Sequence, residues 1–380
     1  MKLFGTISLT LFTFVLSALF ISNCGTNTNS GGERDFLLFA GNDGSGGATY
    51  EENYELWSCD TEDNVTLIKD INPGPDGSLN LDVDTFSLGY SIKYNGELYF
   101  SADDGSRGTE LWKTNGTAVG TTLVADINPD VGYSSPWNLM VFNGELYFQA
   151  TDGSRGTELW KTNGTSVGTT LVADINPDVG HSSPRNLTVH NGELYFSADD
   201  GSRGTELWKT SGTAVGTTLV ADINPDTGHS SPWDLMVFNG ELYFGADDGS
   251  RGRELWKTNG TAVGTTFVAD MNPDTGGSYA YPLTVHNGEL YFGADDGSRG
   301  NELWKTNGTA VGTTLVADIN PGSGGSGLRN LMVFNGGLYF VAYHRDHAYE
   351  IWKTDGTRQG TMMVMDLWPG GGDGCYVAPL

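Results

Sequence analysis

NGELYFQATDGSRGTELWKTNGTSVGTTLVADINPDVGHSSPRNLTVH, residues 143–190, is the unit that most of the chain repeats. The tryptophan of its ELW core marks each copy, and successive tryptophans lie 55 residues apart once and 48 residues apart five times. They are Trp57, Trp112, Trp160, Trp208, Trp256, Trp304 and, in an EIW variant, Trp352. The chain therefore contains seven copies of one unit.

Each copy contains four short runs of β-prone residues with turn signals between them. In residues 143–190 the runs are Glu145–Ala150, Glu158–Thr162, Thr169–Asp174 and Asn186–His190. The Asn-Gly and Asp-Gly pairs and the Gly/Pro-rich segments between them supply tight turns, and no helical period is present. A single four-stranded sheet must stack on neighbours to bury its faces, so this unit predicts one propeller blade. We predict an all-β, seven-bladed β-propeller with four-stranded antiparallel blades.

The two ends of the repeat array differ from its middle. We name the strands of a blade A to D from the axis outwards, so that each unit supplies strands B, C and D of one blade and strand A of the next. The first copy starts at Arg34 with a strand B at Phe36–Ala40, and nothing before it reads as a strand A. Tyr376–Leu380 stands where a further strand A would begin. We predict that this C-terminal strand pairs beside Phe36–Ala40 and closes the ring.

The apolar pattern of the unit predicts its core. The predicted core residues of residues 143–190 are Leu146, Phe148, Leu159, Leu171, Val172 and Ile175. We expect the repeated tryptophan to pack at each blade interface, with its indole N–H reaching a neighbouring loop. The alternative is that the tryptophans stack on a ligand.

The N-terminal residues are typical of export. Residues 1–23 hold one basic residue, Lys2, and an apolar run from Leu3 to Ile21, which predicts a signal peptide. Cys24 follows directly and is the candidate lipid-bearing residue of a cell-envelope lipoprotein; simple secretion and an uncleaved membrane anchor are the alternatives. Residues 24–32 form a polar tether, which leaves residues 33–380 for the propeller.

The charge balance excludes one class of partner. The chain has 47 acidic and 20 basic side chains, a formal net charge of −27, which opposes binding to a nucleic-acid backbone. Cations, sugars and basic proteins remain possible partners. The surplus of acidic residues has a second explanation, because such residues keep a β protein soluble. We expect a monomer that contacts a membrane only through its lipid anchor. Cys59 and Cys375 either form a disulfide or lie too far apart for one.

The segment Glu110-Leu111-Trp112-Lys113-Thr114-Asn115-Gly116-Thr117 resembles the bacterial repeat family named for its ELWxxDGT signature. Similar segments recur through nearly the whole mature chain, four of them with Asn in place of the signature Asp. The resemblance implies an exported, propeller-like repeat protein. It implies no activity or substrate.

A second motif, Asp-Asp-Gly-Ser-Arg-Gly, occupies the predicted loops between strands B and C. Its paired carboxylates in a Gly-rich turn are ligands that suit Ca²⁺, the one cofactor that we consider. The alternative is that the aspartates cap the turn while Arg107 pairs with Glu110. The candidate calcium ligands are Asp103, Asp104, Asp199, Asp200, Asp247, Asp248, Asp295 and Asp296.

The loops between strands D and A carry the most variable residues of the unit. They share one face with the B–C loops under the usual propeller path, and loops carry function more often than strands do. Aromatic and arginine side chains there suit sugar stacking or a protein partner, or else they cover the blade tops. The candidate ligand-binding residues of this rim are Trp137, Arg185, Trp233, Tyr281, Arg329, Tyr133, His181 and His229.

Near-identical blades are a poor setting for catalysis, which needs an asymmetric set of nucleophile, base and charge stabiliser. The sequence shows no nucleophile elbow and no paired catalytic carboxylates, and we name no catalytic residue. We therefore expect a non-enzymatic binding or adhesion module, displayed at the cell surface or secreted, that recognises a glycan or protein through the loop-rich face. The alternatives are a polysaccharide hydrolase or lyase at the channel mouth and a structural envelope protein.

Overall fold

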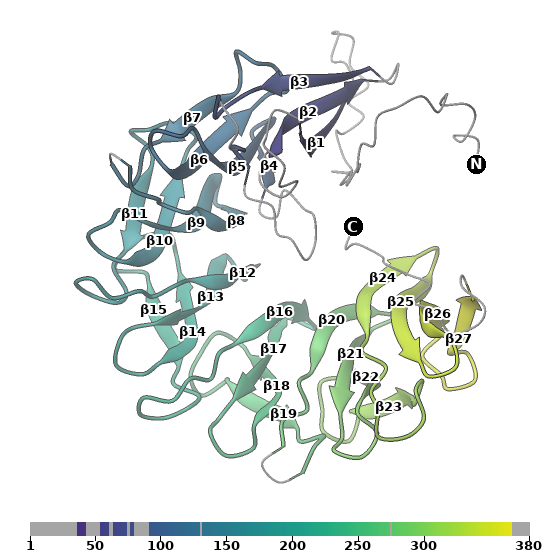
Figure 1. The fold of residues 1–380 in the computed structure, drawn as a ribbon. Coiled ribbons are helices and arrows are strands. Elements are labelled where there is room, and N and C mark those ends of the chain that lie inside the picture. Colours follow the sequence, from purple (N-terminus) through teal and green to yellow (C-terminus); the bar gives the residue numbers. More distant parts are fainter. Residues whose placement is uncertain are drawn as a thin grey trace.

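Seven antiparallel β-sheets follow one another around an arc (Figure 1). The computed structural model describes residues 36–42, 54–60, 64–73, 77–79, 91–129, 131–273 and 276–366. These residues form strands, turns and loops, and none belongs to a helix long and apolar enough to cross a membrane. The architecture confirms the predicted all-β, seven-bladed propeller.

We number the sheets as blades 1 to 7 in chain order. Blade 1 contains β1 (Phe36–Asn42), β2 (Tyr54–Asp60) and β3 (Val65–Lys69). Blade 2 contains β4 (Ile92–Tyr94), β5 (Glu97–Asp103), β6 (Thr109–Thr114) and β7 (Thr122–Ala125). Blade 3 contains β8 (Trp137–Phe142), β9 (Glu145–Thr151), β10 (Thr157–Thr162) and β11 (Thr170–Ala173). Blade 4 contains β12 (Arg185–His190), β13 (Glu193–Asp199), β14 (Thr205–Thr210) and β15 (Thr218–Ala221).

The last three blades continue the same pattern. Blade 5 contains β16 (Trp233–Phe238), β17 (Glu241–Asp247), β18 (Arg253–Thr258) and β19 (Thr266–Ala269). Blade 6 contains β20 (Tyr281–His286), β21 (Glu289–Asp295), β22 (Asn301–Thr306) and β23 (Thr314–Ala317). Blade 7 contains β24 (Arg329–Phe334), β25 (Gly337–His344), β26 (Ala348–Thr354) and β27 (Met362–Met365).

The strands of residues 143–190 lie within one residue of their predicted ends, and β1 extends two residues beyond the predicted Ala40. In blades 2 to 7 the strands pair in chain order, and the first strands of neighbouring blades contact one another. These first strands are therefore the predicted innermost strands A. Within the described residues blade 1 has three strands, which correspond to the predicted B, C and D.

The hydrophobic core lies between successive blades. In one cluster Tyr147 and Leu159 of blade 3 pack with Leu194 and Phe196 of blade 4, and each of these four side chains is at most 1% exposed. The predicted core residues of blade 3 are buried except Leu171, which is half-buried. Each blade thus buries its apolar face against the next one, which is why the array folds as a unit.

The repeated tryptophans pack against these clusters, as predicted, but most remain partly exposed. Trp208 borders the cluster between blades 3 and 4, and Trp304 borders the one between blades 5 and 6. The prediction that the indole N–H reaches a neighbouring loop is wrong for Trp160, Trp208 and Trp352, whose buried Nε1 atoms have no hydrogen-bond partner in the described part of the chain. Packing alone therefore places these three rings.

Several predictions fall on residues outside the described ranges. They concern the signal peptide at 1–23, Cys24, the tether at 24–32, Cys375 and the closing strand Tyr376–Leu380. Among the described strands, none of blade 1 pairs with one of blade 7. Ring closure and the lipid anchor stay predictions.

Candidate functional site

The rim residues stand at the inner, loop-rich ends of the blades. Trp137, Arg185, Trp233, Tyr281 and Arg329 are the first residues of β8, β12, β16, β20 and β24. In blade 4, Arg185 pairs with Ser197 but Thr188 pairs with Tyr195, so β12 carries one extra residue at this point. Asn186, within this bulge, has a φ of 58°. A bulge bends the strand and changes the direction of the side chain that precedes it. The rim residue therefore lies outside the regular hydrogen-bond ladder of the strand.

A buried glutamate holds the loop that leads to each rim residue. Glu206, the first residue of the ELW core in blade 4, is fully buried, with 0% exposure. Its carboxylate accepts hydrogen bonds from Ile223 N at 2.8 Å, Ser230 N at 3.0 Å and Ser230 Oγ at 2.6 Å. Ser230 O in turn accepts from Asp247 N of blade 5 at 3.0 Å. The glutamate therefore ties its own blade to the loop and, through it, to the next blade.

The same clamp recurs around the propeller. It pairs Glu55 with Ser78, Glu110 with Ser134, Glu158 with Ser182 and Glu254 with Ser278, each through the serine hydroxyl at 2.6 Å. The expected ion pair between Arg107 and Glu110 is thus wrong. Arg107 instead pairs with Asp104 of its own turn, because the Glu110 carboxylate is enclosed in the core.

Burial changes the chemistry of the clamp. It raises the pKa of Glu206 to about 7, against the lowering effect of the Ser230 hydroxyl and backbone amides. Ser230 Oγ also lies 3.3 Å from the carbonyl oxygen of Thr205. A protonated Glu206 can therefore donate to Ser230 Oγ while that hydroxyl donates to Thr205 O, which satisfies every polar atom of the group.

The B–C loop aspartates are engaged by their own turns. Asp200 Oδ1 accepts from Ser202 N and Arg203 N, both at 2.9 Å, and Oδ2 pairs with the Arg203 guanidinium. Although burial acts to raise it, the pKa of Asp200 is lowered by these hydrogen bonds and by the arginine charge. Within the described ranges no three His, Cys, Asp or Glu side chains converge as metal ligands. Calcium binding by the eight loop aspartates stays a prediction.

His181 and His229 support the loops. His229 Nδ1 accepts the backbone hydrogen of Thr205 at 2.9 Å and lies 3.1 Å from the Thr205 hydroxyl. Asp199 Oδ2 is 3.9 Å from that same Nδ1 atom. A nucleophile–base–acid relay needs contacts on opposite ring nitrogens, so this group is no catalytic triad. His181 makes the same contacts with Thr157.

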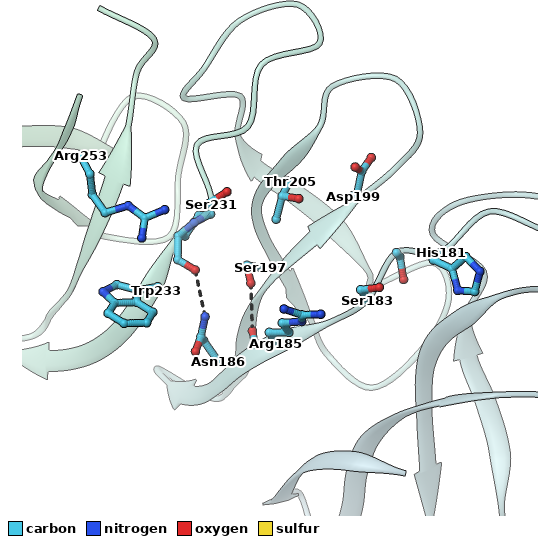
Figure 2. Close-up of a pocket in the computed structure, with 12 residues that line it drawn as sticks. His181, Ser183, Arg185, Asn186, Ser197, Asp199, Thr205, Ser231, Trp233 and Arg253 are labelled. Atoms are coloured by element: carbon cyan, nitrogen blue, oxygen red, sulfur yellow. Dashed lines mark hydrogen bonds between the residues drawn. The ribbon is translucent and has the colours of Figure 1, made fainter. Parts of the chain in front are cut away.

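A pocket of about 430 Å³ opens between blades 4 and 5 (Figure 2). It combines two arginines, an indole, one aspartate and several hydroxyl groups. Its lining residues are His181, Ser182, Ser183, Arg185, Asn186, Ser197, Asp199, Thr205, Ser231, Pro232, Trp233 and Arg253. The pocket thus gathers four of the predicted rim and loop residues, namely His181, Arg185, Asp199 and Trp233.

The two arginines of this pocket rest on aromatic rings. The Arg253 guanidinium lies 5.8 Å from the Trp233 ring centre, and the Arg185 guanidinium lies 5.7 Å from the Trp137 ring centre. Neither forms an ion pair with a carboxylate of the described chain. Asp199 points to its own turn, where Oδ1 accepts from Gly201 N at 2.7 Å. Both guanidiniums therefore keep donors for a ligand.

Arg253 is the charged lining residue that is absent from the predicted rim. It begins strand C of blade 5, at the position before the core glutamate, where the other blades have Tyr54, Thr109, Thr157, Thr205, Asn301 and Tyr349. Comparing the copies position by position reveals this departure, since arginine occurs here in one of the seven copies. The repeat is therefore broken at the wall of the pocket.

The remaining rim residues form local contacts, not one continuous ring. Trp233 meets Tyr281 edge to face with 5.2 Å between ring centres. Arg329 lies 4.7 Å from the ring centre of Tyr349 and donates to its hydroxyl at 3.4 Å. Tyr133, in the loop between blades 2 and 3, is 58% exposed. The structure thus groups the rim into pairs with different chemistry.

Solved structures with a similar fold include hydrolases. No family model matches the sequence, and no curated protein matches it. A Mycobacterium tuberculosis puromycin-hydrolysing peptidase aligns at 10% identity and a TM-score of 0.51 over 87% of this chain and 51% of its own. A puromycin hydrolase aligns at 12% identity and 0.49, over 87% and 53%. The β-propeller domain of the Trilobed protease from Pyrococcus furiosus aligns at 9% identity and 0.43, over 87% and 94%.

These comparisons correct the predicted function. The chain spans about half the length of the puromycin hydrolase and of the puromycin-hydrolysing peptidase. The puromycin-hydrolysing peptidase, which aligns at a TM-score of 0.51, is described as a hydrolytic protein. The interpretation as a non-enzymatic adhesion module is therefore withdrawn. At 10% identity the likeness to the puromycin-hydrolysing peptidase shows the fold alone.

Proposed function

We propose that this chain is the propeller part of a peptide-hydrolysing system. In this role it takes up short peptides at the pocket between blades 4 and 5 and presents them to a catalytic part that lies outside the seven blades. The observation that carries the proposal is the fold shared with the puromycin-hydrolysing peptidase over 87% of this chain. The pocket supports it, because its volume and its few polar groups are typical of a small-ligand site.

We further propose that the blades themselves do not cleave the peptide. Their repeated polar groups serve the scaffold: the glutamates hold loops, the loop aspartates hold turns, and His229 accepts a backbone amide. Groups with these structural tasks are poorly suited to act as nucleophile or base.

The test is a binding and turnover experiment on the full chain. Acetylated di- to tetrapeptides are titrated by calorimetry, and the same peptides and puromycin are then incubated with the protein and followed by mass spectrometry. We expect saturable peptide binding and no cleavage. Absence of binding to any peptide contradicts the role in peptide uptake, and cleavage by the purified chain contradicts the non-catalytic role of the blades.

A further inference from the structure

We propose that the pocket between blades 4 and 5 binds a carboxylate group, and specifically the free C-terminal carboxylate of a short peptide whose last side chain rests on Trp233. This inference deepens the proposed function and rests on it. Its starting point is that two arginines, Arg185 and Arg253, line one pocket in a chain of net charge −27. Cationic side chains without an internal carboxylate partner mark a place for an external anion.

The arginines are held in position before a ligand arrives. Each guanidinium lies over an aromatic ring, Arg253 over Trp233 and Arg185 over Trp137. Stacking on a ring face leaves the N–H groups at the edge of the guanidinium plane free to bind two oxygens side by side. Arg253 is half-buried, so its hydrogen bond to a carboxylate forms in a partly dehydrated setting that strengthens it.

The backbone around the arginines is also fixed. Ser183 N donates to Thr157 O and Ser231 N donates to Thr205 O, both at 3.0 Å. The Asn186 amide bridges the two blades by donating to Pro232 O at 3.1 Å. Both serines line the pocket, and Figure 2 shows Ser183 beside Arg185 and Ser231 on the side of Arg253 and Trp233. Two loops that are anchored in this way present their hydroxyl groups in a constant geometry, which lowers the entropy cost of binding.

The charge of the pocket selects a singly charged anion. Two guanidiniums and the Asp199 carboxylate leave one net positive charge among the lining side chains with histidine neutral. A carboxylate neutralises this charge, whereas a phosphate dianion would leave one net negative charge in the pocket. The volume of about 430 Å³ is enough for one or two amino-acid residues.

The Trp233 indole supplies the apolar part of the site. The ring is 38% exposed and forms one wall of the pocket. An apolar or aromatic side chain next to the bound carboxylate can cover this ring, as aromatic pairs contribute beyond their buried area. A carboxylate beside an apolar group also occurs in other molecules, such as a uronic acid with its hydrophobic sugar face, and the experiment separates these sources.

The experiment compares two peptides that differ in one group. Acetyl-Ala-Phe with a free carboxylate and its C-terminal amide are titrated into the full chain by calorimetry. We expect the amide to bind about tenfold more weakly or worse, because a charge-assisted hydrogen bond is lost. Equal binding of both peptides overturns the carboxylate site but leaves peptide uptake intact. Tighter binding of glucuronic acid than of the free peptide also overturns the assignment.

Two variants and a control locate the site. Arg253→Thr restores the residue that blades 2, 3 and 4 carry at this position, so it preserves the fold. Arg185→Ala removes the second guanidinium. We expect each to weaken the free peptide about tenfold or more. Arg329→Ala is the control, because Arg329 has the same repeat position but rests on Tyr349 in blade 7, and we expect a change below about twofold.

The outcomes separate a specific site from a general charge effect. An equal loss of peptide affinity in the Arg329→Ala control and in the two pocket variants overturns the proposal, since peptide binding then depends on net charge alone. An unchanged affinity in Arg253→Thr, with an unchanged melting temperature, overturns it as well. A thermal melt accompanies each titration, so that unfolding is recognised and the affected variant is replaced by Arg253→Lys, for which we expect a smaller loss than for Arg253→Thr.

Discussion

The junction between blades 4 and 5 and the junction between blades 5 and 6 share one scaffold and present different chemistry. Glu206 and Glu254 hold the two connecting loops through the same serine contact of 2.6 Å. At the first junction Arg185 and Arg253 border a pocket. At the second, Trp233 and Tyr281 meet edge to face. The difference teaches that the clamp sets the backbone, while the first residues of strands A and C decide what the rim can bind.

Removing the clamp is the strongest way to test the shared scaffold. Glu206→Ala leaves Ile223 N and Ser230 N without their buried acceptor and leaves the Ser230 hydroxyl with the Thr205 carbonyl oxygen alone. We expect a loss of about 4 kcal/mol in the free energy of unfolding, since each unsatisfied buried group costs about 1 to 3 kcal/mol. Urea denaturation followed by tryptophan fluorescence measures it.

The comparison between junctions supplies the control. Glu254→Ala removes the same contacts at the next junction and should cost about as much as Glu206→Ala. Peptide binding, however, should be lost mainly in Glu206→Ala, because Ser231 and Trp233 follow the loop that Glu206 holds. Markedly different stability losses in the two variants would show that the scaffold is not equivalent at the two junctions.

The clamp also makes stability depend on pH. Burial raises the pKa of Glu206 and of Glu254 from the ordinary 4.5 to about 7. The folded chain therefore keeps protons that the unfolded chain has released between these two values. Its stability falls as the pH rises through this window and then levels off. The turn aspartates, such as Asp200 with its lowered pKa, act below their ordinary value of 3.8 and do not reverse this trend.

Glu206→Gln measures how much one clamp contributes to the pH dependence of stability. Glutamine cannot ionise, so the free energy of unfolding of this variant should fall less than that of the parent between pH 5 and pH 8. The difference between the two falls should be at most about 3 kcal/mol. Thermal melts at half-unit pH intervals provide the data. A parent protein that gains stability from pH 5 to pH 8 would disprove the sign of the effect.

The repeat made the blades predictable, because its turn signals and apolar positions recur in register. The strand predicted at Glu158–Thr162 is observed at Thr157–Thr162. The role of Glu158 was not predictable, since its partners Ile175 and Ser182 lie 17 and 24 residues along the chain. A glutamate in an acidic, turn-rich chain is expected at the surface, and only the folded loop supplies the donors that allow its burial.

The candidate site was likewise predictable in part from the sequence. Arg185 and Trp233 were predicted as rim residues, because they vary at one loop position of an otherwise constant unit. Arg253 is also visible as a variation, but its contact with Trp233 depends on the bulge that sets the direction of each rim side chain. The register shift between β16 and β17 follows from the positive φ of Asp234. This backbone conformation is not predictable from the sequence.

A smaller effect tests the contact between blades 4 and 5 away from the pocket. A Cβ on Gly260 of blade 5 would lie 2.2 Å from the Tyr195 hydroxyl oxygen of blade 4, at a φ of 90°. We expect Gly260→Ala to cost about 2 kcal/mol from steric and backbone strain. Gly240→Ala is the matched control, because Gly240 also has positive φ, 77°, but no atom lies within 4 Å of the added Cβ. Similar losses in both variants would assign the cost to the backbone alone.

The smallest effect is expected for Arg203, an arginine close to the pocket but outside its lining. Arg203 pairs with Asp200 in the B–C turn of blade 4, and its side chain is 46% exposed. Exposed ion pairs contribute less than about 1 kcal/mol, so Arg203→Ala should change the free energy of unfolding by no more than that. Its charge equals that of Arg253, but its guanidinium is occupied by a carboxylate, so peptide affinity should stay within about twofold. Calorimetry with acetyl-Ala-Phe on both variants measures the contrast, and a loss in Arg203→Ala that matches Arg253→Thr would show that nearby positive charge, and not the built pocket, attracts the peptide.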